Sequence, residues 1–213
     1  MLITVVGPGF GTEKTDFCRA LAQELGYRFV SLDIDEFSDV DFDETKNDDL
    51  KNFFKMNEDI LRGIEQAILD ARDENAILDF GPSDVYTSLL TYSTSCFDAS
   101  NGSKFDKKEI ASFERRLKQI EAKSVELSQE LIDFTVHFPA NTNCDYYAGL
   151  LDILSLTTYG FLSKIKVPAV SVPRERLSAE EYVAPVAQEI REMQNNAVDP
   201  NRELMDKLKV TIN

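Results

Sequence analysis

The sequence predicts an α/β fold in which a five-stranded parallel sheet lies between helices in three layers. Short apolar runs alternate along the chain with longer segments of helical spacing, as a parallel sheet with crossover helices requires. A glycine-rich segment joins the first apolar run to the first helical segment. With 213 residues, of which 43% are hydrophobic and 29% charged, the chain is long enough for one substantial domain with its own core.

The expected strands are short apolar runs at 2–6, 27–32, 75–80, 134–138 and 167–172. The expected helices cover 14–25, 50–72, 85–92, 106–132, 146–162 and a final segment from 179 onward. Asp106 and Ser178 are expected to be N-caps, with Glu181 completing a capping box after Ser178. We predict a turn at 98–103, a lid region at about 94–132, a single domain over 1–195 and a tail over 196–213 that carries a short helix at 201–208.

Composition disfavours several classes of protein. The net charge is −15, from 23 basic and 38 acidic residues, whereas proteins that grip nucleic acid usually gather basic side chains. No apolar run reaches the ~18 residues of a membrane span, and no signal peptide is recognised, so a cytoplasmic location is expected. The odd number of cysteines favours reduced thiols over disulfides or a zinc site, and the only histidine, His137, is expected to be a strand residue.

The segment 7–15 has the layout of a phosphate-binding loop. Backbone N–H groups of such a loop and the following helix N-terminus face an anion, Lys14 would reach the β- and γ-phosphates, and the Thr15 hydroxyl would ligate Mg²⁺. Pro8 and Glu13 stand where the usual spacing G-x-x-x-x-G-K-[ST] has glycine, which we interpret as a one-residue insertion. A strand–turn–helix corner with three glycines is the alternative interpretation of these residues.

The interval from Lys14 to Leu25–Gly26 resembles the start of small P-loop kinases, and Leu78–Asp84 resembles the third-strand segment of nucleoside and nucleotide kinases. The resemblance covers most of Met1–Met193 and implies the three-layer P-loop NTPase fold. Phe80 replaces an arginine that often stands in this family segment. The resemblance further implies that the phosphates of ATP are surrounded by Gly9, Gly11, Thr12, Glu13, Lys14 and Thr15.

Three acidic sites follow predicted strands, where open α/β sheets bind their ligands. Asp79 ends an apolar strand and would hold Mg²⁺ beside Thr15; a turn-initiating Asp before Gly-Pro is the alternative. Asp33 and Asp35 follow the second strand, where related kinases place a carboxylate that contacts the acceptor, and Asp33 would accept its proton. A solvated acidic loop explains these two equally well. Asp84 is the further candidate for contact with the substrate.

Positive charge on the transferred phosphoryl group would come from a helical lid, for which Arg115 and Arg116 are the candidates. Arg174 and Arg176 follow the fifth strand. In the family that the chain resembles, the loop at this place packs near the nucleotide base, so the resemblance implies a guanidinium group stacked on adenine.

The predicted function is therefore an ATP- and Mg²⁺-dependent kinase of a small acceptor, a nucleoside or (deoxy)nucleoside monophosphate. A kinase of a modified nucleotide in DNA and a non-catalytic nucleotide-binding module, or pseudokinase, are the alternatives. Glu13 and Phe80 are the arguments for the non-catalytic module. The expected partners are small nucleotides, with nucleic acid disfavoured, no membrane, and homodimer formation left open.

Overall fold

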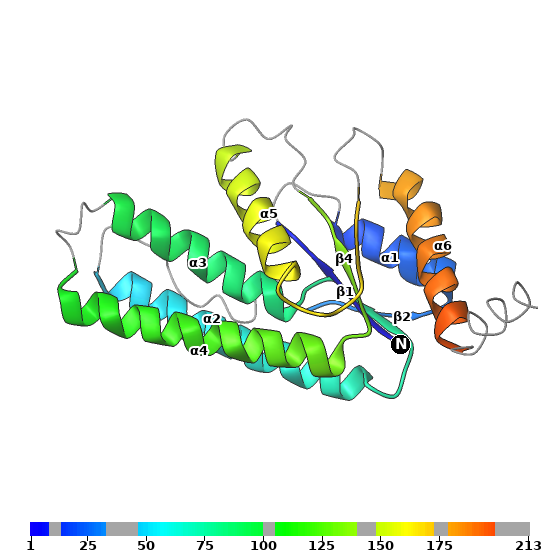
Figure 1. The fold of residues 1–213 in the computed structure, drawn as a ribbon, viewed down its shortest axis with the longest axis horizontal. Coiled ribbons are helices and arrows are strands. Elements are labelled where there is room, and N and C mark those ends of the chain that lie inside the picture. The colour runs from blue at the N-terminus through cyan, green and yellow to red at the C-terminus, as the bar shows by residue number, and fades with distance from the viewer. Residues whose placement is uncertain (9–13, 33–46, 100–104, 140–147, 173–178, 199–213) are drawn as a thin grey trace, which may run out of the picture.

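The computed structural model describes residues 1–8, 14–32, 47–99, 105–139, 148–172 and 179–198. Strands and helices alternate along these ranges as the sequence predicts, with two successive helices between the third and fourth strands (Figure 1). The strands are β1 (Leu2–Val6), β2 (Arg28–Val30), β3 (Ala76–Leu78), β4 (Phe134–His137) and β5 (Ala169–Ser171). The helices are α1 (Lys14–Leu25), α2 (Asn47–Ala71), α3 (Pro82–Ala99), α4 (Lys107–Leu131), α5 (Ala148–Leu162) and α6 (Ala179–Val198).

The five strands form one parallel sheet in the order β2-β3-β1-β4-β5. β1 is the central strand, and its residue Ile3 pairs with Ile77 of β3 on one side and Phe134 of β4 on the other. The predicted fold class is confirmed. Because all strands run in the same direction, the segments that follow β1, β2 and β3 meet at one edge of the sheet.

Helices cover both faces of the sheet and give the molecule its three layers (Figure 1). α1 and α6 lie together on one face, and α2, α3, α4 and α5 lie on the other. Alternate residues of β1 serve the two hydrophobic cores: Ile3 and Val5 face α1 and α6, whereas Leu2 and Val6 face the larger helical layer. Such double coverage explains why β1 is apolar on both faces.

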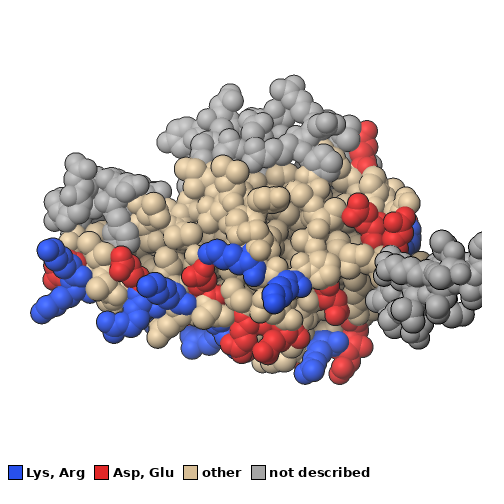
Figure 2. Space-filling model, viewed as in Figure 1, with Lys and Arg blue, Asp and Glu red and all other residues tan. Residues whose placement is uncertain are grey.

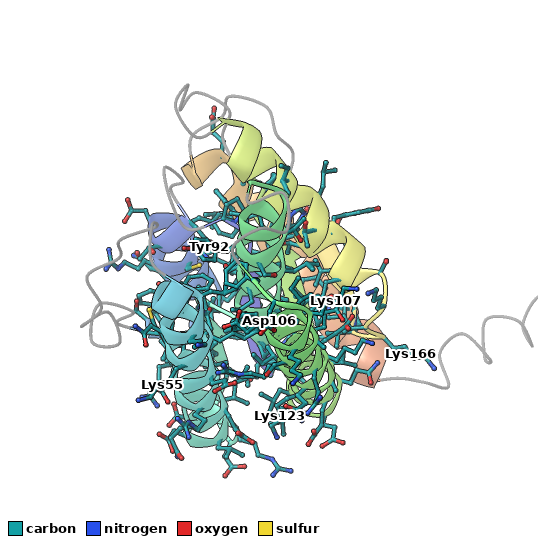
Figure 3. All side chains as sticks on the ribbon, turned by 90° about the vertical axis from the view of Figure 1, so that its left-hand side faces the viewer. Lys55, Tyr92, Asp106, Lys107, Lys123 and Lys166 are labelled. Atoms are coloured by element: carbon teal, nitrogen blue, oxygen red, sulfur yellow. The ribbon has the colours of Figure 1, made fainter. Side chains whose placement is uncertain are left out.

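The larger layer is built on three long helices that lie side by side. The aromatic rings of Phe54 on α2 and Phe113 on α4 stack with their centroids 5.3 Å apart. Figure 3 looks onto the end of this layer, where Asp106 marks the start of α4 and Tyr92 lies on α3. Lys123 on α4 pairs with Glu65 on α2 at 2.9 Å. α4 is thus packed along its neighbours, and a lid role for the region 94–132 stays a prediction.

The helix predicted at 85–92 is present but is longer than expected, because α3 runs from Pro82 to Ala99. Proline is favoured at the first helical position, since its fixed φ suits a helix and it has no N–H to leave unpaired. The helix therefore begins directly after Gly81, and Asp84 lies in its first turn. The turn predicted at 98–103 is corrected at its start, because Asp98 and Ala99 are helical; residues 100–103 lie outside the described ranges.

Charged and uncharged side chains separate on the face shown in Figure 2. Lys and Arg lie along the lower part of this face, from the lower left past the centre to the lower right, with Asp and Glu among them, and the upper middle of the described surface is uncharged. The large hydrophobic side chains exposed in the described part of the chain include Ile153, Leu156 and Tyr159 of α5. None of the helices in the described ranges combines the length and the apolar character that crossing a membrane demands.

Candidate functional site

The turn after β1 depends on Gly7. Its φ is +137°, a backbone conformation that residues with side chains rarely adopt, and an added Cβ would lie 1.9 Å from the carbonyl oxygen of Phe138. The N–H of Phe138 donates to the carbonyl of Val6 at 2.8 Å, so the ends of β1 and β4 are held together at this point. Residues 9–13 lie outside the described ranges, and the chain resumes with Lys14 as the first residue of α1.

Lys14 is buried beneath this turn, with only 5% of its side chain exposed. Its Nζ donates to the carbonyl oxygen of Gly7 at 3.2 Å and lies 3.8 Å from Oδ2 of Asp84. The ring of Phe80 lies against the same ammonium group, 5.2 Å from Nζ to the ring centroid. A single cation is therefore fixed at the N-terminus of α1, where the helix already favours an anion.

Asp84 is the counter-charge of Lys14 and is equally buried. Its Oδ1 accepts from the N–H of Gly7 at 2.8 Å, and its Oδ2 accepts from the N–H of Gly81 at 2.9 Å. Burial raises the pKa of the Asp84 carboxyl, whereas Lys14 and the two N–H groups act in the opposite direction. The carboxylate thus joins the turn after β1 to the turn before α3, and its predicted contact with substrate stays a prediction.

Asp79 follows β3 directly and receives three donors. Its Oδ2 accepts from the hydroxyl of Ser31 at 2.8 Å and from the hydroxyl of Thr15 at 3.3 Å. Its Oδ1 accepts from the N–H of Leu32 at 3.4 Å, and its own N–H donates to Val30 at 3.3 Å. The structure therefore brings Thr15 and Asp79 together, as the sequence predicts, although they are far apart in the chain.

The Thr15–Asp79 pair has the chemistry that Mg²⁺ prefers. Magnesium takes oxygen ligands and commonly keeps several waters, so one or two protein oxygens suffice beside a phosphate. Thr15 donates its hydroxyl proton to Asp79, which leaves the lone pairs of Thr15 Oγ1 available to a metal. Within the described ranges there is no group of three or more His, Cys, Asp or Glu that could hold a metal ion. The pair fits a metal shared with a phosphate better than one held by protein alone.

The predicted arginines of the lid lie away from this cluster, on α4. Arg115 is exposed. Arg116 pairs with Glu58 of α2 at 3.0 Å, and its guanidinium lies 5.0 Å from the ring centroid of Phe54. The remaining predicted site residues, Gly9, Gly11, Thr12, Glu13, Asp33, Asp35, Arg174 and Arg176, lie outside the described ranges.

Ser31 is the site residue that sequence reasoning missed. The one signal in the sequence is its position, because Ser31 is a small polar residue directly after the apolar strand β2. β2 pairs with β3, the strand that Asp79 follows. Two other polar groups are part of the core rather than of this cluster. Burial raises the pKa of the Cys18 thiol, which disfavours the nucleophilic thiolate. His137 lies in β4 with its Nδ1 3.0 Å from the Ser171 hydroxyl.

Solved structures with the same general fold include a NadR protein in complex with NAD and AMP-PNP. It matches with a TM-score of 0.56 and 14% identity, over 87% of this chain and 48% of the NadR chain, so this chain spans about half of that protein. A YorR protein from Bacillus subtilis, in complex with phosphorylated GDP, matches with a TM-score of 0.44 and 18% identity, over 92% and 97% of the two chains. Neither a protein-family model nor a curated protein matches the sequence. The molecule has the fold of the P-loop NTPases.

Proposed function

We propose that the protein binds a purine nucleoside triphosphate with Mg²⁺ at the turn after β1 and transfers its γ-phosphoryl group to a small acceptor. The observation that carries the proposal is that two features occur together at one edge of the sheet: a buried lysine and a hydroxyl–carboxylate hydrogen bond. Lys14 is buried at the start of α1, and the next residue, Thr15, donates to Asp79 at the end of β3. A strand–turn–helix corner without a ligand needs neither feature, since burying an ammonium group costs free energy.

The residues of the cluster have distinct roles in this proposal. Lys14 neutralises the β- and γ-phosphates, and Thr15 and Asp79 would hold the metal. Mg²⁺, when bound, neutralises the charge that develops on the phosphate oxygens. The NadR structure, which has the same fold and contains AMP-PNP and NAD, supports a nucleotide ligand for this fold.

The proposed transfer is a direct displacement at phosphorus. The acceptor oxygen, a hydroxyl of a nucleoside or a phosphate oxygen of a nucleoside monophosphate, forms a bond to the γ-phosphorus, the bond from this phosphorus to the bridging oxygen breaks, and the purine nucleoside diphosphate leaves. Where the acceptor is a hydroxyl, Asp33 takes its proton. The proposed acceptor is a nucleoside or (deoxy)nucleoside monophosphate, and Asp35 and Asp84 are proposed to contact it. For Arg116, a role at the phosphates would require it to leave its ion pair with Glu58.

A non-catalytic nucleotide-binding module is the second candidate. The observation that favours it is the contact between Phe80 and Lys14, because Phe80 stands where the resembled kinases often have an arginine. A phenyl ring cannot donate hydrogen bonds to a phosphate, and it covers one side of the ammonium group. In this candidate the protein binds the nucleotide without transferring phosphate.

The test is the affinity for ATP, measured by calorimetry with Mg²⁺ present, in the wild type and in Lys14→Ala. A hydrogen bond to a charged group is worth about 1.5–3 kcal/mol, so binding should weaken by roughly 10- to 100-fold. Lys166→Ala, which removes an exposed lysine after α5, is the matched control and should bind as the wild type does. Unchanged ATP affinity in a folded Lys14→Ala protein would contradict the proposal. Lys14→Ala/Asp84→Asn serves as the second variant, because it leaves no unpaired buried charge.

A further inference from the structure

The Asp79 carboxylate is held from two sides. Thr15 reaches it from α1, and Ser31 and Leu32 reach it from the chain that follows β2. The contact from Ser31 is the shortest of the three, at 2.8 Å against 3.3 Å from Thr15 and 3.4 Å from Leu32. The hydroxyl of a residue outside the phosphate-binding loop is therefore the nearest donor to this carboxylate.

Strand register explains why Ser31 occupies this place. Val30 of β2 pairs with Leu78 of β3, so the next residues along each strand, Ser31 and Asp79, are neighbours as both strands end. The N–H of Asp79 donates to Val30, which fixes its backbone beside β2. The neighbouring position is thus set by the sheet, and a serine there needs only its ordinary side-chain length to reach Oδ2.

The two contacts from the β2 side restrict the rotation of the carboxylate. Ser31 binds Oδ2 and Leu32 binds Oδ1, so each oxygen has a donor on the same side. With both held, Oδ2 stays directed toward Thr15. A carboxylate that lacked the Ser31 contact could turn about its χ2 torsion, which is broad for aspartate. Partners of this kind orient the ligands of a metal and affect its affinity.

We infer that Ser31 is a positioning residue for Asp79, which it holds in the orientation that serves a metal bound with the nucleotide phosphates. The inference rests on the proposed function, because the metal enters with the nucleotide.

The test measures binding rather than turnover. The Mg²⁺ concentration that half-saturates ATP binding is determined by calorimetry for the wild type, Ser31→Ala and Ser31→Thr. Removing a residue that orients a metal ligand typically weakens metal affinity about 10- to 100-fold, and Ser31→Ala should fall at the lower end because Thr15 and Leu32 still contact Asp79. Ser31→Thr keeps the hydroxyl and should restore the wild-type value. ATP affinity measured without Mg²⁺ should be the same in all three proteins.

Ser163→Ala is the matched control, since this serine is exposed and its hydroxyl donates only locally, to Gly160. The inference is overturned if Ser31→Ala has the wild-type Mg²⁺ requirement while Asp79→Asn does not; the proposed function then stands. It is also overturned if Ser31→Ala weakens ATP binding equally with and without Mg²⁺, because that indicates general damage to the site. A wild type that binds no ATP overturns the proposed function and the inference together.

Discussion

The Lys14–Asp84 pair shows how one residue can serve both the fold and the site. Asp84 accepts from the N–H groups of Gly7 and Gly81 and lies 3.8 Å from the Lys14 ammonium group. Gly81 is itself held closely, since an added Cβ would lie 2.7 Å from Cγ1 of Val6. The same carboxylate therefore fixes the two turns that border the site and supplies the charge that makes burial of Lys14 tolerable.

Asp84→Asn is expected to lower the free energy of unfolding by about 3 kcal/mol, the typical cost of leaving one partner of a buried ion pair alone. The amide group would also present N–H donors to the backbone N–H of Gly7 or Gly81. Lys14→Met/Asp84→Asn should be less destabilised than the sum of its single variants by about 1–3 kcal/mol, because neither charge is then left unpaired. Urea denaturation of the four proteins measures this coupling. Simple additivity would show that the two charges do not interact.

At the scale of single elements, α4 has a complete capping box at its N-terminus. Asp106 Oδ1 accepts from the N–H groups of Lys108 at 2.7 Å and Glu109 at 2.8 Å. In turn, the side-chain carboxylate of Glu109 accepts from the N–H of Asp106 at 3.0 Å. The cap was predictable because an aspartate precedes a segment of helical spacing. These bonds satisfy N–H groups that no helical carbonyl can reach.

Asp106→Ala should lower the free energy of unfolding by about 1 kcal/mol, since it removes the acceptor for two N–H groups of the first turn. For a chain of this size that corresponds to a melting temperature about 2–4 °C lower. Asp106→Asn keeps a capping oxygen and should lose less. Thermal unfolding followed by circular dichroism compares the three proteins, and equal losses in both variants would mean that charge rather than capping is responsible.

The sequence predicted those elements whose apolar spacing and end signals agree, among them β1, α1 and α4. It predicted α3 too short, because serine and threonine favour non-helical conformations in isolation. In the structure their hydroxyls bond back to helical carbonyls: Thr87 donates to Ser83, and Ser93 and Thr94 donate to Leu90. A helix containing such residues depends on burial against its neighbours, which a single segment of sequence does not reveal.

The candidate site likewise contains residues that could be predicted from the sequence and contacts that could not. Lys14, Thr15 and Asp79 could be predicted because each stands at a recognisable end of a strand or loop. The contact of Ser31 could not be predicted, because it depends on the register between β2 and β3. The two N–H contacts of Asp84 were equally hidden, since they require the turns after β1 and β3 to lie next to each other.

At the scale of the whole molecule, the two candidate functions, a kinase and a non-catalytic nucleotide-binding module, predict different effects of Glu13→Gly on ATP consumption and ATP binding. We expect the wild type to consume ATP when an acceptor is present, and Glu13→Gly to retain or exceed that rate. The substitution removes a charge that repels the triphosphate and allows the loop more backbone conformations. Asp79→Asn, which should lose turnover with little change in melting temperature, is the inactive control.

The measurements are acceptor-stimulated ATP consumption and ATP affinity, with nucleosides, nucleotides and DNA as acceptors. A wild type that is inert with every acceptor, together with ATP binding that appears only in Glu13→Gly, would identify the protein as the non-catalytic module. The same acceptor series tests the alternative of a kinase acting on a modified nucleotide in DNA.

The central place of β1 also determines how the chain must fold. β1 comes earliest of the strands, yet Leu2 pairs with Ala76 and Ile3 with Phe134, so neither of its neighbours is close to it in sequence. Pairings between such distant segments form slowly, because a long loop must close before any contact compensates for the lost entropy. During synthesis, this wholly buried strand has no partner on its β4 side until the chain has been made as far as His137. The edge of β1 that pairs with β4 therefore stays unpaired until these residues have been made, and we expect the yield of folded protein to depend on chaperones that cover it.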